Sequence, residues 1–176
     1  KELYSLGSFN IKDGAVRYNS SYGAPAKGLD PNHIALNNIQ IGLDSLKYHG
    51  KEMGAVIHTF SFDERSGLSV TSLTGTLRSD TTSIYIPDLQ LRTLNSYLNL
   101  TATADWSSLG EPSSGAFRIK LASDIGKQDV LLAAGDLPET FAKEYPFRPL
   151  VLRADVEGNI SRINIKEIRA ELPGAF

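Results

Sequence analysis

The chain has 176 residues, of which 41% are hydrophobic and 22% charged, so it is long enough for one domain with a sizeable core. Its 18 basic residues nearly balance 20 acidic ones and neither sign forms a run, which excludes the electrostatic footprint of a nucleic-acid-binding protein. The absence of cysteine excludes a disulfide scaffold, a thiolate zinc site and cysteine catalysis.

The first residue of the chain is not methionine, which indicates how the chain arose. It begins at Lys1, and its single methionine is Met53. We therefore expect residues 1–176 to be one β-rich segment excised or processed from a longer protein. No apolar run approaches the roughly 18 residues of a membrane-spanning helix, so we expect any membrane anchor to lie outside this segment.

The first third of the chain alternates between apolar and polar residues, which predicts strands. Residues 9–18 form two short alternating runs around Asp13-Gly14, a dipeptide that favours a type I′ hairpin turn. Residues 19–32 collect Gly, Pro, Ser and Asn and predict a loop. Strands are expected over residues 33–48, 53–63 and 68–77, with Glu64 and Arg65 as the solvated charges of a tight turn.

Residues 83–106 show the strand period most clearly. The alternation runs unbroken over residues 98–106, which is roughly 30 Å at about 3.3 Å per residue. Apolar residues recur at every second position within each block, and polar residues fill most of the places between. This pattern predicts a sheet with one apolar face, whose candidate lining residues are Ile84, Ile86, Leu89, Leu91, Leu98 and Leu100.

The apolar period slips by one residue at three places. The slips fall at Pro87-Asp88, Asn37-Asn38 and Lys166-Glu167, where apolar residues stand three apart instead of two. A strand can keep its apolar side facing one way across such a slip only if it bulges or bends. We therefore predict a bend or β-bulge at each of the three pairs.

The periodicity of the apolar residues changes from strand-like to helical in one part of the chain. Residues 127–145 predict a short pair of helices, with Gly135 ending the first helix and Pro138 opening the second. Residues 117–121, 150–156 and 160–172 return to the strand pattern. About ten strands without βαβ alternation predict a mainly β protein whose mostly antiparallel sheet pairs neighbours in sequence.

No enzyme motif is present. The chain has no nucleophile elbow, phosphate-binding loop or zinc-protease signature, and its three histidines have no ligand-like spacing. We therefore expect no catalytic residue, no metal site and no cofactor. The many threonines of residues 71–103 suit a solvated strand face, an ice-binding face or the sugar-binding face of a secreted carbohydrate-binding β-sandwich.

Several stretches carry a resemblance to a known family. These are LDPNHIALNNI at residues 29–39, FSFDERSGL at 60–68 and LQLRTLNSYL at 89–98. A strand opening with Ile11 and Gly14 and a helix pair leading into residues 150–165 add to it. Together they resemble the AsmA-like superfamily and, within it, the TamB-type translocation and assembly proteins of Gram-negative bacteria.

The resemblance implies a fold and a function. It implies a long curved sheet folded lengthwise into an apolar-lined trough, the β-taco plan, in a periplasmic protein anchored to the inner membrane outside this segment. Such a trough would carry phospholipid acyl chains between inner and outer membrane during outer-membrane biogenesis. An alternative is a scaffold that binds outer-membrane proteins by strand addition at an open sheet edge.

Overall fold

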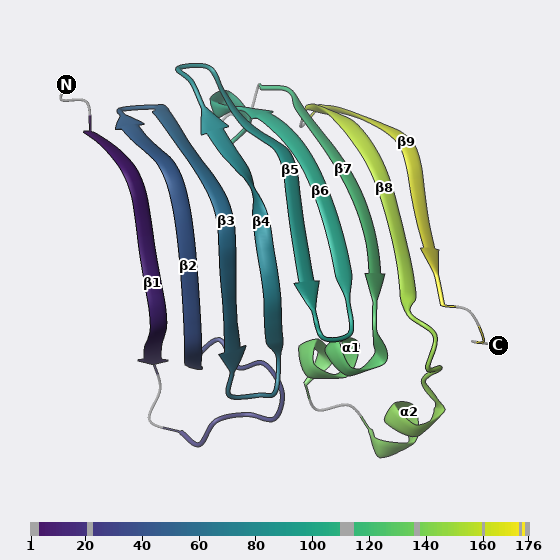
Figure 1. Cartoon of the computed structure of the whole chain (residues 1–176). Coiled ribbons are helices and arrows are strands. Elements are labelled where there is room, and N and C mark those ends of the chain that lie inside the picture. The colour runs from purple at the N-terminus through teal and green to yellow at the C-terminus, as the bar shows by residue number, and fades with distance from the viewer. Residues whose placement is uncertain are drawn as a thin grey trace.

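The structure is a computed structural model that describes residues 4–20, 23–109, 115–135, 138–159, 161–172 and 174, with the side chains of 139 and 141 left out. The described residues form one nine-stranded antiparallel sheet in which every strand pairs with its neighbours in sequence (Figure 1). β1 and β9 are the two ends of the strand order. Its strands are β1 Tyr4–Asn19, β2 His33–His49, β3 Glu52–Glu64, β4 Ser69–Ser79, β5 Ser83–Thr93, β6 Tyr97–Asp105, β7 Phe117–Ile125, β8 Leu150–Asn159 and β9 Arg162–Glu171.

Helices occupy one end of the sheet. α1 spans Lys127–Ala134 and α2 spans Glu139–Glu144, both between β7 and β8 and at the lower end of the strands in Figure 1. A 3-10 turn, Trp106–Ser108, follows β6 at the other end. The expected mainly β fold with one short helical pair near residues 127–145 is therefore confirmed.

The three predicted bends are confirmed. The pairing shifts by one residue between Ile86 and Leu89 in β5, between Asn37 and Gln40 in β2, and opposite Asp155–Val156 where Lys166 is the extra residue. Each shift inserts one residue into one strand of a pair, which is the definition of a β-bulge. Each strand thus continues beyond its bend with its apolar side on the same face.

The predicted hairpin at Asp13-Gly14 is wrong. β1 runs through this dipeptide without reversing and pairs with β2 on both sides of it. Asp13 has a φ of 54°, and the register shifts on either side of Gly14, so the dipeptide forms a bulge. Asp-Gly accepts the positive φ of a bulge as readily as that of a type I′ turn, and the long apolar partner strand β2 selects the bulge.

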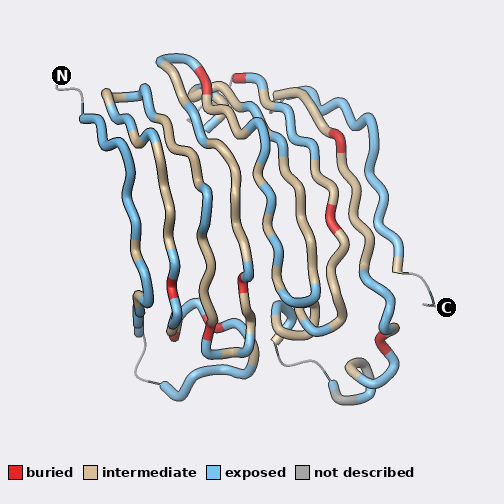
Figure 2. Tube along the Cα trace, viewed as in Figure 1, coloured by how far each residue is buried: buried red, intermediate tan, exposed pale blue. Residues whose placement is uncertain are grey.

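The described residues form no second layer against which the sheet could bury a face. Among the described residues, the buried apolar side chains are Ile39, Val70 and Tyr145. Figure 2 shows most of the sheet as intermediate or exposed. The chain of 19.2 kDa exposes 11510 Å², whereas a compact monomer of this mass exposes about 8,400 Å². The excess of roughly 3,000 Å² is what a single-layer sheet with uncovered faces would expose.

Candidate functional site

The six predicted lining residues lie together on one face of β5 and β6. Leu89 pairs with Leu100 and Leu91 pairs with Leu98, and directly paired residues of an antiparallel sheet share a face. Ile84 and Ile86 join them because the bulge at residues 87–88 restores the phase. All six side chains are half-buried, so this stripe is not the sealed interior of a core.

The apolar stripe extends well beyond the two strands that the sequence singled out. Following the pairing from edge to edge gives one row with a residue from every strand, and no member of the row is polar. We call this side of the sheet the inner face. The row is Phe9, Leu43, Ile57, Gly75, Leu89, Leu100, Leu121, Ala154 and Ile168.

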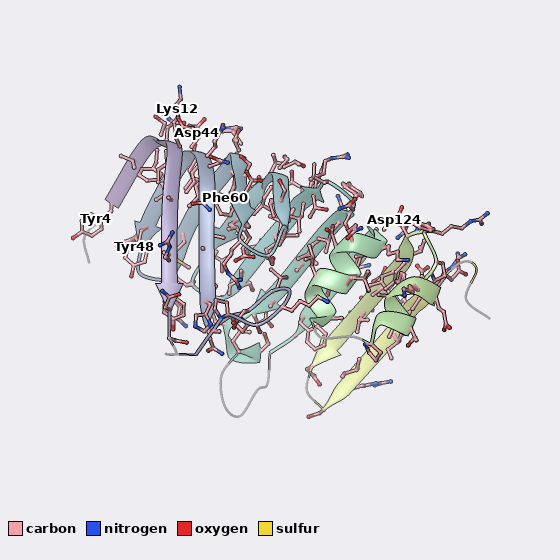
Figure 3. The ribbon with its side chains drawn as sticks, turned by 90° about the horizontal axis from the view of Figure 1, so that it is seen from below. Tyr4, Lys12, Asp44, Tyr48, Phe60 and Asp124 are labelled. Carbon is pink, nitrogen blue, oxygen red and sulfur yellow. The ribbon has the colours of Figure 1, made fainter. Side chains whose placement is uncertain are left out.

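The outer face has the opposite chemistry. From β3 to β9, the corresponding row on that face is Gly54, Arg78, Tyr85, Thr103, Arg118, Glu157 and Asn164. Polar side chains contact one another on this face, including His58 with Asp44 at 2.8 Å and the ion pair of Lys166 with Glu157 at 2.7 Å. Figure 3 shows Lys12 and Asp44 on the outer side of the bend in β1 and β2. The sheet therefore separates an apolar concave side from a polar convex one.

The inner face is almost without charge. Glu64 is a charged side chain that the pairing assigns to this face, because it lies opposite Leu36 at the end of β3. The sequence predicted a solvated charge here. That prediction is correct for Arg65, which is exposed, and wrong for Glu64, which is 8% exposed.

Two apolar hollows lie near the two ends of the strands. The upper hollow, about 340 Å³, is bounded by residues of β2 to β5, among them Tyr48, Met53 and Leu77, and also by Lys47, Gly54 and Arg78. The lower hollow, about 360 Å³, is bounded by Leu29, Asp30, Pro31, Ile34, Leu36, Phe62, Glu64 and Leu68. Sequence reasoning missed both, because each needs residues from several elements.

The loop before β2 forms one wall of the lower hollow, and Asp30 holds that loop in place. The Asp30 carboxylate accepts hydrogen bonds from the N–H groups of Ala26 and Asn32, both at 2.9 Å, and lies 2.8 Å from Nδ1 of His33. These contacts, with the Ala26 N–H first, lower the pKa of Asp30 to about 2. The backbone N–H of Leu29 also donates to the carbonyl of Leu132 in α1, at 3.0 Å.

Gly28 makes the contact between this loop and α1 possible. Its φ is 78°, and a Cβ at this position would lie 2.6 Å from the Leu132 carbonyl oxygen. The connection between β1 and β2 therefore touches the connection between β7 and β8, although the sheet places them far apart. This contact fixes the loop along the lower end of the trough (Figure 1).

A hollow of about 480 Å³ lies elsewhere, on the outer face of β6 to β9, and polar residues such as Thr103, Arg118, Glu157 and Asn164 dominate its lining. Arg118 lies 3.8 Å from both Asp155 and Glu157 there. The sheet itself separates this outer-face hollow from the trough.

Within the described residues, no group of three or more His, Asp or Glu side chains could hold a metal ion, and no helix is long and apolar enough to cross a membrane. Comparison of the chain with protein-family models, with curated proteins and with solved structures finds no match. The geometry of the trough is therefore the basis for a functional proposal.

Proposed function

We propose that this chain is a non-enzymatic segment of a cell-envelope protein that carries phospholipid between inner and outer membrane in its apolar trough. One observation carries the proposal: the inner face is apolar across all nine described strands and is left open to solvent. Soluble monomers rarely expose a contiguous apolar patch of more than a few hundred Å² unless they use it. The resemblance to the AsmA-like superfamily agrees with this function.

Acyl chains fit this face energetically. Each methylene transferred from water to an apolar surrounding gains about 0.8 kcal/mol, so half of a 16-carbon chain gains roughly 6 kcal/mol. A lining of Ile, Leu, Val and Phe makes no directional contact with a hydrocarbon chain. Lipid can therefore slide along such a trough while its head group stays in water.

Glutamate substitutions in β6 test whether lipid occupies the face. Leu98→Glu and Leu100→Glu place a carboxylate on the half-buried inner face, where it can still reach water. We expect both variants to stay folded, as judged by circular dichroism, while bound phospholipid falls at least tenfold in native mass spectrometry of protein purified from cells. Asn99→Glu is the matched control, since residue 99 pairs with Gln90 and Ala122 on the outer face.

Two results would contradict the proposal. One is global unfolding of both leucine variants, which would indicate a sealed core because burying an unpaired carboxylate costs several kcal/mol. The other is the absence of copurified phospholipid from the wild-type protein together with the absence of lipid photocrosslinks from residues 98 and 100 in cells.

A second candidate function, binding of outer-membrane proteins by strand addition, is favoured by the two sheet edges. β1 and β9 each pair on one side only within the described residues, and every residue of β9 is exposed. An edge of this kind is a template for another strand. A photocrosslinking amino acid at Arg169 of β9 should then capture an outer-membrane protein in cells, whereas one at Thr101 of the central strand β6 should not. The third alternative, a carbohydrate-binding sandwich, requires two packed sheets, and the described residues form one.

A further inference from the structure

We propose that the lower hollow binds the primary ammonium group of an amphiphile whose alkyl chain lies on the inner face, with Glu64 as the ammonium acceptor. This inference rests on the proposed function and names the head-group chemistry that the trough prefers. An aminophospholipid and a simple alkylamine both carry this group.

The lower hollow is a formed pocket with fixed walls. β2 and β3 supply Ile34, Leu36 and Phe62, and the preceding loop supplies Leu29 and Pro31. The Asp30 carboxylate and the hydrogen bond from Leu29 to Leu132 hold that loop against α1. A ligand entering the hollow therefore meets a site that needs little further ordering, which favours affinity.

Glu64 is the charged residue of this site whose carboxylate can still accept hydrogen bonds from a ligand. It accepts the N–H of Ser66 at 2.6 Å and the N–H of Ala35 at 3.4 Å. Although burial alone would raise the pKa of Glu64, the Ser66 side chain, the N–H groups of Ser66 and Ala35 and the nearby charge of Arg65 together lower it, so the carboxylate is ionised at neutral pH. No cationic side chain of the described residues forms an ion pair with Glu64.

The carboxylate of Asp30 has fewer free acceptor positions for a ligand. Asp30 also borders the lower hollow, but the N–H groups of Ala26 and Asn32 and the ring of His33 already occupy its oxygens. Glu64 uses two of roughly four lone-pair positions for backbone N–H groups. Glu64 itself borders the apolar lower hollow, and an apolar surrounding strengthens a charge-assisted hydrogen bond.

A primary ammonium matches these features. It carries a positive charge and three donors, so it can bind an ionised carboxylate by a charge-assisted hydrogen bond. A trimethylammonium group has the same charge but no N–H donor. A phosphate or carboxylate head group without an amine would meet only repulsion from Glu64.

Isothermal titration calorimetry with two cationic amphiphiles of equal chain length tests this inference. Dodecylammonium and dodecyltrimethylammonium, both below their critical micelle concentrations at pH 7, differ in N–H donors and head-group size. We expect the wild-type protein to bind dodecylammonium at least tenfold more tightly. Glu64→Gln should remove this preference, and Asp63→Asn should keep it, because Asp63 is the adjacent residue on the outer face and accepts a hydrogen bond from the Ser69 hydroxyl there.

A zero-length crosslink gives a second readout that needs no variant. Carbodiimide activation of a carboxylate followed by attack of a bound amine forms an amide, and the carbodiimide leaves as the urea. With dodecylamine and wild-type protein, we expect the peptide containing Glu64 to be the main adduct in mass spectrometry, despite the low exposure of this side chain. Adducts confined to exposed carboxylates would overturn the inference.

The outcomes separate this inference from the proposed function. Equal affinity of the wild-type protein for both amphiphiles, or an unchanged preference in Glu64→Gln, would overturn the ammonium site and leave the trough intact. Failure of both amphiphiles to bind at all would contradict the trough and the ammonium site together.

Discussion

Asp30 links the stability of the lower hollow to pH. Its pKa is about 2 in the folded protein against 3.8 in an unfolded chain, so folding favours its ionised form. The stabilisation is therefore complete above about pH 4 and is lost as the pH falls through 2. Asp80, which accepts hydrogen bonds from Thr82 and Ser83, also has a pKa of about 2 and acts in the same direction.

We expect the urea midpoint of the wild-type protein to fall steeply between pH 4 and pH 2.5. Asp30→Asn should lower the midpoint at pH 6 and flatten this acid dependence, with the remaining slope due in part to Asp80. Urea titrations at four pH values measure both effects. A pH profile of Asp30→Asn parallel to that of the wild type would contradict the role of this carboxylate.

Gly75 is the residue on which the bulge of β5 depends. It lies opposite Leu89, and a Cβ there would be 2.2 Å from the carbonyl oxygen of Asp88 and 2.9 Å from Cα of Leu89. Both neighbours are backbone atoms, and Gly75 has a φ of 149°, so any side chain must displace the bulge.

We expect Gly75→Ala to cost about 2 kcal/mol or more in the free energy of unfolding, measured by urea denaturation. Gly54→Ala is the matched control within the same sheet, because its nearest neighbour would be the Ser45 carbonyl oxygen at an ordinary 3.9 Å. The control should change the free energy of unfolding by less than about 0.5 kcal/mol. Equal effects of the two substitutions would show that β5 does not need the close approach.

At the scale of the element, the bulges decide which face a strand shows. Successive side chains of a strand point to opposite faces of the sheet. A one-residue insertion or deletion therefore moves every later side chain to the other face. In β5, the bulge at residues 87–88 keeps Ile84 and Ile86 on the same face as Leu89 and Leu91. An uninterrupted strand would turn one of these pairs toward the polar outer face.

Deletion of Asp88 should therefore be far more damaging than its substitution. We expect the deletion variant to aggregate or to unfold at a much lower urea concentration, because two large apolar side chains would point outward beside Arg78 and Thr103. Asp88→Ala keeps the residue count and should remain close to the wild type, since Asp88 is exposed. A deletion variant as stable as Asp88→Ala would mean that the register of β5 is not set by its apolar residues.

At the scale of the whole molecule, the proposed function predicts that lipid stabilises the fold. A ligand that binds only the native state at one hundred times its Kd adds about 2.7 kcal/mol. For a chain of this length, that corresponds to a rise in Tm of roughly 5 to 10 °C. The folded chain already exposes 11510 Å² of surface. A ligand can therefore reach the inner face without prior unfolding.

Differential scanning calorimetry with a short-chain phospholipid measures this effect. We expect dihexanoylphosphatidylcholine below its critical micelle concentration to raise Tm, and glycerophosphocholine, which has the same head group without acyl chains, to leave it unchanged. An equal effect of both compounds would locate the interaction at the polar outer face instead of the trough.

Local sequence determined much of this architecture by itself. Strand periodicity gave the positions of most strands, the one-residue slips gave three bulges, and helical spacing gave the pair α1 and α2. These features depend only on which neighbours along the chain share a face, so they can be derived without knowing the partner strands.

Only the tertiary structure decided how these pieces meet. Asp13-Gly14 became a bulge because its flanking runs both found partners in β2, and Glu64 became buried because the turn and Ala35 supply N–H groups to it. The lower hollow needs Leu29 and Phe62 side by side, which depends on the contact of the loop with Leu132 of α1. Such features arise from residues distant in sequence, whose pairing no local period encodes.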